Sequence, residues 1–402
     1  MTENHTFIRV PYGMSVHGEE EIEAVLKVLR KSTQMGNNVM SLEKKIASFF
    51  DKKFGLMVNS GSSALLLAFE ILDLPKGSEV ITPALTFSTT VSSIIKAGLI
   101  PSFVDVKKDT YCIEPCKIEK MITKKTKAIC APNLIGNLAD WKEINKIAKK
   151  HNLLLIEDSA DTLGGVIDQN SSGSYSDISI TSFYGSHVVN GAGNGGMLCL
   201  NDENYLKKAK LLRSWGRSSS LFKDSEAIEN RFNVNLDGIE YDAKFVFESV
   251  GYNLEPSEVS AAFALVQLNN LDLNIQKRIE NFEKQIHFFS DYKHFFSLPI
   301  QLPNSKTGWL AFPIIVKDSA PFKRRDLQIF LEKRNIQTRV VFTGNINRQP
   351  GFRDITKKID PTGYPESDYV MRGGMLLACH HGLTGEMMKH VHQSVKLFLD
   401  QY

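Results

Sequence analysis

The sequence predicts an α/β protein with a large, mixed and mostly parallel sheet, followed by a smaller C-terminal α+β domain. From residue 54 onward, short apolar runs alternate with amphipathic stretches, which is typical of βα units that build parallel sheets. The run at 153–156 is entirely apolar and is followed at once by two acids, as in a strand covered by helices on both faces. Past residue 297, strand and helix patterns alternate in a shorter, separate region. These three observations predict the fold class.

The first region contains a regular series of predicted elements. The strand at 153–156 is expected at the centre of the sheet, because it is the most apolar of the series. The glycine-rich turn at 191–196 would allow a hairpin between the last two strands. In chain order, the series consists of strands at 54–58, 78–82, 101–106, 128–132, 153–156, 178–183 and 197–200 and helices at 62–72, 86–97 and 141–151.

The pattern changes twice further along the chain. Residues 217–247 are rich in Ser, Asn, Asp and Lys with scattered aromatics, which predicts a long excursion or a poorly ordered segment. Helical periodicity returns at 258–279, with Asn270 and Asn274 as candidate interruptions. Beyond it we predict strands at 310–316 and 338–342 and helices at 324–334 and 386–399. The predicted division is therefore a large α/β domain with an N-terminal helical segment (1–255), a helical connector (256–296) and a small α+β domain (297–402).

Composition excludes several classes of protein. The 402 residues are 42% hydrophobic and 23% charged, which are ordinary values for a globular chain. With 48 basic and 45 acidic residues the net charge is +3, which does not favour a nucleic-acid partner. The five cysteines form no zinc-like spacing, and the adjacent His380 and His381 have no acidic or cysteine partner at ligand spacing, so no metal site is expected. Without a signal-like N-terminus or a long apolar run, we expect a cytoplasmic protein that does not enter a membrane.

Three motifs stand where predicted strands end. Gly61 and Ser62 open a helix, where free amides and the helix dipole favour a phosphate, although an ordinary serine N-cap explains the same residues. Asp158 follows the central strand, where ligands of open sheets gather; it would pair with a protonated heterocyclic nitrogen or simply cap a helix. The third motif is Thr-Ser-Phe-Tyr-Gly-Ser-His, residues 181–187, which ends in a histidine that could be catalytic or structural.

In this order, and with Gly-Tyr-Asn at 251–253, the motifs resemble the fold-type I, vitamin B6-dependent sugar aminotransferase family (DegT/StrS type), over about residues 11–402. Enzymes of this family act on nucleotide-linked keto sugars. The resemblance implies a homodimer with shared active sites, and it assigns a role to each matching position. Gly61, Ser62 and Ser182 would hold the cofactor phosphate, Phe87 would stack on the pyridine ring, Asp158 would pair with the ring nitrogen, Asp161 would lie near the ring hydroxyl, and Asn253 would reach the phosphate in the neighbouring subunit.

The main departure from the family is His187. In the aminotransferases a lysine closes this motif and forms a Schiff base to pyridoxal phosphate, which imidazole cannot do. A histidine here is similar to the 3-dehydratases of the colitose and ascarylose pathways. Tyr184 and the segment 344–350 look closest to the ascarylose enzyme. If the one-residue excess between His187 and Gly196 lies earlier in the motif, Val188 would take the lysine position instead; the ungapped match from Ser182 favours His187.

The resemblance then implies a reaction. Untethered pyridoxamine phosphate would condense with the C4 ketone of a nucleotide-linked 4-keto-6-deoxyhexose, and His187 would act as base and then as acid while the C3 hydroxyl leaves. The iron–sulfur relatives hold their cluster with four cysteines, and the matching positions here are Ala160, Ser218, Ser220 and about Ile228, so no cluster is expected. Glutamate would therefore regenerate the pyridoxamine form.

Three arginines are candidates for the nucleotide diphosphate, namely Arg217, Arg339 and Arg348, although each on its own is more simply explained as a surface or structural residue. The product would supply a dideoxysugar for a surface polysaccharide or a glycosylated metabolite. Two other readings of the chain stay open. One is an aminotransferase, which would need another lysine at the cofactor, and the other is a non-catalytic sensor of the cofactor or of a sugar nucleotide.

Overall fold

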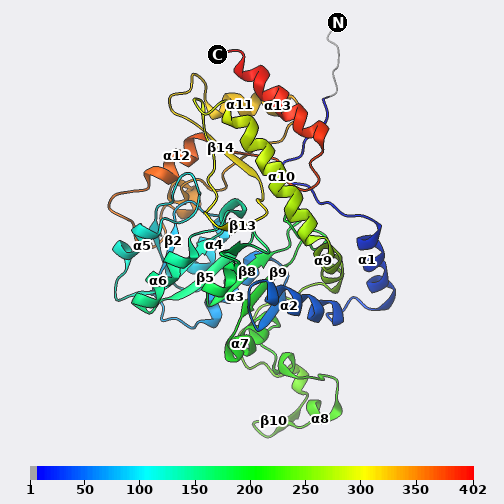
Figure 1. The fold of residues 1–402 in the computed structure, drawn as a ribbon. Coiled ribbons are helices and arrows are strands. Elements are labelled where there is room, and N and C mark those ends of the chain that lie inside the picture. The colour runs from blue at the N-terminus through cyan, green and yellow to red at the C-terminus, as the bar shows by residue number, and fades with distance from the viewer. Residues whose placement is uncertain (1–6) are drawn as a thin grey trace.

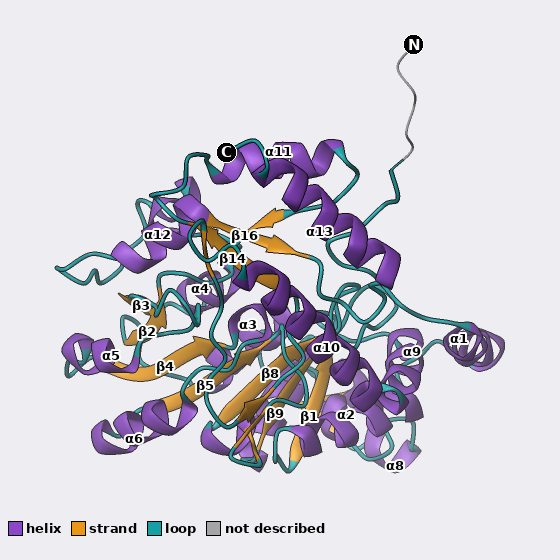
Figure 2. Cartoon of the chain, turned by 45° about the horizontal axis from the view of Figure 1, so that its top comes forward, coloured by secondary structure: helices purple, strands orange, loops and turns teal. Residues whose placement is uncertain are grey.

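The computed structural model describes residues 7–402 and is built around a seven-stranded sheet (Figures 1 and 2). Five neighbouring strands, from the middle of the sheet to one edge, run parallel, and β9 pairs antiparallel with both of its neighbours. The strand order across the sheet is β1 (Phe54–Val58), β9 (Gly196–Leu200), β8 (Ile178–Ser182), β5 (Leu154–Ser159), β4 (Thr126–Pro132), β2 (Glu79–Pro83) and β3 (Ile100–Val104). The predicted mixed, mostly parallel sheet is confirmed.

The central position of β5 is also as predicted. β5 is the fourth strand of the seven, and every residue from Leu155 to Ser159 is buried. β8 and β9 form an antiparallel pair joined by residues 183–195, so the glycine-rich turn does lie within a hairpin connection. Because parallel strands end at the same edge, the motifs that follow β5 and β8 are brought side by side.

Helices cover both faces of this sheet (Figure 2). Their apolar stripes pack on the buried strands, as in other doubly covered sheets. The helices of this region are α1 (Glu19–Lys31), α2 (Asn37–Phe49), α3 (Gly61–Ile71), α4 (Ser88–Lys96), α5 (Pro115–Met121), α6 (Trp141–His151) and α7 (Glu203–Arg213).

The predicted long helix at 258–279 is two helices. α9 (Glu258–Asn269) ends at Asn270, and α10 (Leu271–Ser290) begins directly after it, so Asn270 interrupts the helix as expected. Asn274 does not interrupt it; this residue lies within α10 and is buried. α10 continues to Ser290 because its apolar residues recur at helical spacing up to Phe289.

The C-terminal part forms a second, four-stranded antiparallel sheet in the order β12 (Phe296–Ser297), β14 (Phe312–Val316), β16 (Gly374–Leu377) and β15 (Arg339–Val340). Helices α11 (Arg324–Lys333), α12 (Pro365–Gly373) and α13 (Gly385–Leu399) pack around it and share an aromatic-rich core. The N-terminal segment reaches this part as well, since Val10 pairs with Ile336. The small three-stranded sheet β13 (Ser305–Lys306), β6 (Val166–Ile167) and β7 (Asn170–Ser171) joins chain segments from the two regions.

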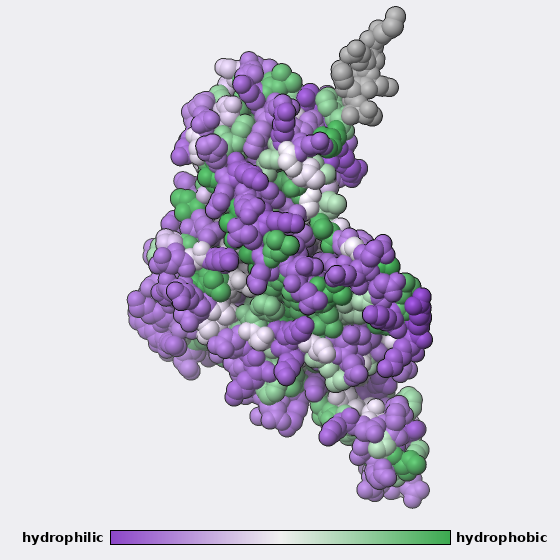
Figure 3. All heavy atoms as spheres, turned by 45° about the vertical axis from the view of Figure 1, so that its right-hand side comes forward, coloured by the Kyte–Doolittle hydropathy of each residue, from purple (hydrophilic) through white to green (hydrophobic). Residues whose placement is uncertain are grey.

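The excursion at 217–247 is not a structureless segment. It contains the short helix α8 (Ile228–Arg231), the hairpin β10 (Val234–Leu236) and β11 (Ile239–Tyr241), and two 3₁₀ turns at 218–221 and 243–245. Arg231 holds these pieces together through hydrogen bonds to Asp242. We call residues 217–250 the arm, because it projects from the body (Figure 1), with hydrophobic side chains among polar ones on its surface (Figure 3).

Among residues 7–402, no helix combines the length and the apolar character needed to cross a bilayer.

Candidate active site

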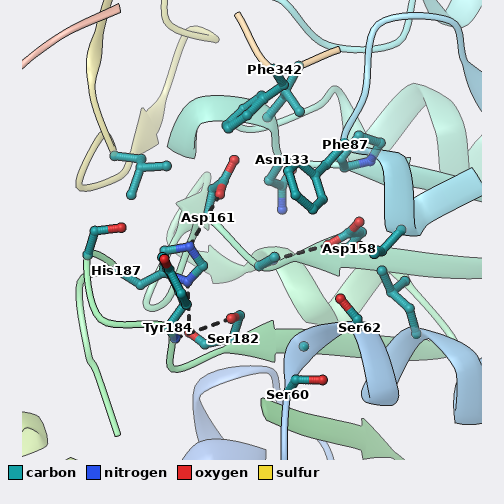
Figure 4. A pocket seen from close by; sticks show the side chains of 18 of the residues that line it. Ser60, Ser62, Phe87, Asn133, Asp158, Asp161, Ser182, Tyr184, His187 and Phe342 are labelled. Carbon is teal, nitrogen blue, oxygen red and sulfur yellow. Dashed lines mark hydrogen bonds and ion pairs between the residues drawn. The ribbon is translucent and has the colours of Figure 1, made fainter. Parts of the chain in front are cut away.

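A cavity of about 380 Å³ lies at the carboxyl ends of the central strands (Figure 4). Its floor comes from the turns after β1, β2, β4, β5 and β8, and its roof comes from the N-terminal segment and the C-terminal part. The lining residues are Tyr12, Ser60, Gly61, Ser62, Leu65, Phe87, Thr89, Pro132, Asn133, Leu134, Asp158, Ala160, Asp161, Ser182, Tyr184, Ser186, His187, Asn194, Gly195, Leu310 and Phe342.

At one end, the start of α3 forms a cradle suited to a phosphate. Ser60 caps the helix by accepting a hydrogen bond from the Ser63 amide at 3.1 Å, while the amides of Gly61 and Ser62 belong to the first turn and have no intrahelical acceptor. A Cβ on Gly61 would lie 2.7 Å from Cβ of Ser182, so glycine is required for this close approach. The two segments predicted to hold the phosphate do meet here, and their amides and hydroxyls fit an anion.

Asp158 lies at the end of β5 and is 4% exposed. Its carboxylate accepts hydrogen bonds from Thr90 Oγ1 at 2.7 Å and from the Ala160 amide at 3.2 Å. Burial raises the pKa of Asp158 above its usual value, and the two hydrogen bonds oppose that effect. A protonated ring nitrogen would relieve the cost of this buried carboxylate, so the side chain fits the pyridine nitrogen of a B6 cofactor.

An aromatic wall borders the cavity near Asp158. Phe87 is half exposed, and its ring meets that of Phe342 edge to face with centroids 5.9 Å apart. Phe87 therefore offers a ring face into the cavity, as stacking on a pyridine ring requires (Figure 4).

His187 lies at the opposite wall, held by the backbone of its own loop. Its Nδ1 lies 3.1 Å from the carbonyl oxygen of Ser182. Because a carbonyl only accepts, Nδ1 must donate, and the neutral ring then carries its lone pair on Nε2. Nε2 is 3.8 Å from Oδ1 of Asp161, and the Tyr184 ring packs edge-on against the imidazole at 5.8 Å.

Burial sets the protonation of this pair. It lowers the pKa of His187 to about 4 and raises the pKa of Asp161 to about 7. The Asp161 carboxyl also accepts the Ile135 amide at 2.9 Å, which opposes its shift. At neutral pH the imidazole is therefore uncharged, and Nε2 can accept a proton.

Val188 takes no part in this lining. Its side chain is 3% exposed and packs in a hydrophobic cluster with Phe183, Val189 and Met197. Of the two residues that compete for the lysine position in the sequence, only His187 borders the cavity.

The other candidate residues lie outside the cavity of their own chain. Asn253 is exposed beside the base of the arm, where it pairs with Ser214. The guanidinium of Arg217 stacks on Trp215 at 4.1 Å, and that of Arg348 forms a two-pronged pair with Asp368 at 2.6 and 2.5 Å. Arg339 is exposed on β15, 5.6 Å from the ring of Tyr12, which does line the cavity.

His380 and His381 have structural partners. His380 Nε2 bonds to the Pro11 carbonyl at 3.0 Å, and His381 Nδ1 accepts from Arg278 Nε at 3.3 Å. Within residues 7–402, no group of three or more His, Cys, Asp or Glu side chains is arranged to hold a metal ion.

Sequence reasoning missed several lining residues that come from distant parts of the chain. Tyr12, Leu310 and Phe342 form the roof, and no local motif marks them. Asn133 supports the floor: its amide donates to Glu157 at 2.9 Å and to Ser159 at 2.8 Å, while its carbonyl accepts the Trp141 indole at 2.8 Å. The local signal for this contact was weak: Asn133 is a polar residue directly after β4, and Glu157 is an acid within the otherwise apolar start of β5.

The cavity lining contains no lysine or arginine. No amine among these residues can therefore form a covalent bond to a B6 aldehyde, and any cation for a phosphate or diphosphate must come from elsewhere.

Comparison with known proteins places the chain in a family. The model of the DegT/DnrJ/EryC1/StrS aminotransferase family matches residues 15–396. The chain is 33% identical over 400 residues to dTDP-4-dehydro-2,6-dideoxy-D-glucose 3-dehydratase of Saccharopolyspora spinosa, covering 97% of this chain and 86% of that protein. It is 30% identical to GDP-4-keto-6-deoxy-D-mannose 3-dehydratase of Yersinia pseudotuberculosis, covering 97% and 98% of the two chains.

Solved structures agree. The Escherichia coli GDP-4-keto-6-deoxy-D-mannose-3-dehydratase with bound hydrated PLP superposes with a TM-score of 0.86 at 26% identity, over 96% of this chain and 99% of that one. The Helicobacter pylori aminotransferase PseC, at 24% identity and a TM-score of 0.85, shares the fold, over 98% of this chain and 100% of that one. Fold and cavity thus define a protein of the fold-type I aminotransferase class. Within that class, the chain belongs to the DegT/DnrJ/EryC1/StrS family, whose members include 3-dehydratases as well as aminotransferases.

Proposed function

We propose that this protein is a pyridoxamine/pyridoxal phosphate-dependent 3-dehydratase that removes the C3 hydroxyl of a nucleotide-linked 4-keto-6-deoxyhexose, with His187 as its acid/base residue. One observation carries the proposal: a neutral imidazole, with no lysine beside it, borders the cavity where the family's aminotransferases have their lysine. Relatives that carry 3-dehydratase names support it.

The cofactor, when bound, supplies an amine for the C4 ketone and a ring that withdraws electrons. The residues of this chain would bind and orient the cofactor and would move the proton. The amides of Gly61 and Ser62 and the hydroxyl of Ser182 would bind its phosphate, Phe87 would fix the plane of the ring, and Asp158 would keep the ring nitrogen protonated.

His187 would carry the proton. Its Nε2 lone pair would accept a proton from the carbon next to the ring, and the resulting imidazolium would give that proton to the departing C3 hydroxyl, which leaves as water. The low pKa of His187 leaves its ring unprotonated at neutral pH, so that Nε2 is free to accept a proton, and it makes the imidazolium a better proton donor to the departing hydroxyl. No net proton is gained or lost by the enzyme.

We propose further that the active unit is a homodimer. Several side chains of the arm are largely exposed, including Ile228 at 71%, Ile239 at 64% and Val250 at 97%. Burial of such a surface against a second copy is favourable. Asn253 follows the arm directly, so a docked arm would carry it to the neighbouring site, and Arg217, at the start of the arm, could meet the diphosphate there. Arg339 and Arg348 are the candidates for binding the diphosphate from the same chain as His187.

We propose that the protein holds no iron–sulfur cluster, since positions 160, 218, 220 and 228 hold Ala, Ser, Ser and Ile. Without a cluster, we propose that glutamate is the amino donor that regenerates the pyridoxamine form.

The test uses purified full-length protein with pyridoxal phosphate and L-glutamate, followed by CDP-, GDP- or dTDP-linked 4-keto-6-deoxyhexose. We expect the absorbance to shift from the aldehyde to the amine form, and mass spectrometry to show a sugar that has lost its C3 oxygen.

His187→Asn should abolish this product while the cofactor still binds, and His151→Asn, at a partly exposed histidine paired with Glu119, should not. An aminated sugar that keeps its C3 oxygen would show an aminotransferase and refute the dehydratase. Unchanged cofactor absorbance and an intact sugar would indicate a sensor, and unchanged turnover in His187→Asn would remove His187 from the mechanism.

A further inference from the structure

Arg278 is a fully buried cation behind the candidate active site. It lies on α10 with 0% of its surface exposed, and no ion pair among residues 7–402 includes it. Burial lowers its pKa to about 10, so the guanidinium stays charged at neutral pH. Its Nη2 is buried without a hydrogen-bond partner. A buried charge with no opposite charge costs folding free energy, so stability alone does not explain an arginine here.

The guanidinium is hydrogen-bonded to the backbone of the cavity roof. Nη1 donates to the carbonyls of Trp309 at 3.0 Å and Leu310 at 3.1 Å. Leu310 lines the cavity, and its own amide donates to the carbonyl of Ile135 at 2.8 Å. Arg278 thereby fixes a strip of backbone that connects the roof to the turn after β4.

That turn connects to the acid/base pair. Ile135 has a positive φ of 62°, a conformation that β-branched residues rarely adopt, so neighbouring contacts must hold it there. Its amide donates to Oδ2 of Asp161 at 2.9 Å, and Oδ1 of the same carboxyl faces His187 Nε2 at 3.8 Å. An unbroken series of contacts therefore runs from Arg278 through residues 310 and 135 to Asp161 and His187.

Arg278 also acts on His187 through its charge. The titratable groups that face His187 are Asp161 after β5, Tyr184 on the same loop, Tyr12 from the N-terminal segment and Arg278 from α10. Arg278 is the one cation in this group, and its field disfavours the imidazolium form in addition to the larger effect of burial.

We propose that Arg278 is a positioning residue for His187: its guanidinium anchors the backbone that orients Asp161 against the ring, and its unpaired charge adds to the effect of burial in disfavouring the imidazolium form. This inference deepens the proposed function, because it concerns the same histidine, but its first test needs neither cofactor nor turnover.

The test compares two variants. Arg278→Gln keeps an N–H donor and loses the charge, whereas Arg278→Lys keeps the charge and loses the planar set of guanidinium N–H donors. The matched control is Arg213→Gln, at another buried arginine, which donates to the Met57 carbonyl and pairs with Glu43. The pKa of His187 is measured by NMR on protein labelled at histidine Cε1 without cofactor, and its signal is assigned as the one missing from His187→Asn.

We expect Arg278→Gln to raise the pKa of His187 by about half a unit or more, while Arg278→Lys leaves it within about 0.2 unit of the wild type. Arg213→Gln should lower the thermal midpoint without moving this pKa. In the loaded enzyme, kcat should fall in both Arg278 variants with little change in KM for the sugar nucleotide, because Arg278 does not line the cavity.

An unchanged His187 pKa in folded Arg278→Gln would overturn the proposal. If that variant does not fold, Arg278→Lys decides: a preserved pKa with reduced kcat supports the positioning role, and a pKa raised by about half a unit or wild-type kcat overturns it. Failure of the dehydratase assay with the expected NMR shift would refute the proposed function while leaving the electrostatic role of Arg278 in place.

Discussion

At His187, the same surroundings set the direction of the lone pair and the charge of the ring. The hydrogen bond from Nδ1 to the Ser182 carbonyl directs the lone pair of Nε2 toward the cavity. Burial then keeps the ring neutral, since its pKa is lowered to about 4. In the proposed mechanism the Nε2 lone pair must point at the reacting carbon, so the contacts of His187 with Asp161 and Tyr184 would decide its orientation.

Asp161 yields the first prediction, on stability. Its pKa is raised to about 7 in the folded protein against about 3.8 unfolded, so the unfolded state releases its proton first as the pH rises. The free energy of unfolding should therefore fall between about pH 4 and pH 7, by something on the order of 4 kcal/mol from this group. Asp161→Asn, which removes the charge and can still accept the Ile135 amide, should raise the thermal midpoint of the unloaded protein at pH 8 and do so less at pH 5.

The control is Asp354→Asn at an exposed aspartate, which should change the midpoint little at either pH. An Asp161→Asn variant no more stable than wild type at pH 8 would mean that the carboxyl carries its charge there without cost.

Gly61 yields the second prediction, on cofactor binding. An alanine Cβ would lie 2.7 Å from Cβ of Ser182, so Gly61→Ala must separate α3 from β8 at the phosphate cradle. We expect the Kd for pyridoxal phosphate, measured by absorbance titration, to rise about tenfold or more, which corresponds to ~1.4 kcal/mol. Gly185→Ala is the matched control, because the nearest atom to its Cβ is 3.8 Å away. Equal Kd values for the two variants would argue against a phosphate at the start of α3.

At the scale of elements, local pattern identified the seven strands of the main sheet and helices α3, α4 and α6, but neither helices α5 and α7 nor the contacts between distant segments. Helix α6 is observed at 141–151 as predicted, since Asp140 caps it and its apolar stripe is clear. Residues 217–247 were predicted to be a long excursion or a poorly ordered segment. The hairpin of the arm was missed because it is too short and polar to show a period and depends on the Arg231–Asp242 pair. The phosphate cradle and the acid at the end of β5 were marked by local residues, whereas Tyr12, Leu310 and Phe342 reach the cavity only through tertiary packing.

A contact between two helices yields the third prediction. The buried carboxylate of Glu258 on α9 accepts the backbone amides of Gly36 at 2.8 Å and Asn38 at 2.7 Å, at the start of α2. Glu258→Ala would leave these amides without an acceptor and is expected to lower the free energy of unfolding by about 2–3 kcal/mol in urea titration. Glu283→Ala, at an exposed site on α10, should cost less than about 0.5 kcal/mol. A loss no greater at Glu258 than at Glu283 would show that solvent replaces the cap.

At the scale of the whole molecule, the site is shared between regions far apart in sequence. The floor comes from residues 60–195, whereas Leu310 and Phe342 of the roof belong to the C-terminal part, and Asp105 ties the two together by accepting the amides of Glu366 and Ser367, both at 2.9 Å. The division at residues 255 and 296 stays a prediction. The absence of a cation in the cavity lining, together with the exposed arm and Asn253, is the reason to expect a second copy of the chain at the site.

Subunit complementation tests this sharing and gives the last prediction. If Asn253 serves the neighbouring subunit, His187→Asn and Asn253→Asp should each be inactive alone, because each places one defect in every site of its own homodimer; the added carboxylate would repel the phosphate. In a mixed dimer, one site would combine wild-type His187 of one chain with wild-type Asn253 of the other. Random reassortment makes half of the dimers mixed, so unfolding and refolding an equal mixture should restore about a quarter of wild-type dehydration. Recovery near zero, with mixed dimers verified by mass spectrometry, would show that Asn253 acts within its own chain, and full activity of Asn253→Asp alone would show that it has no role.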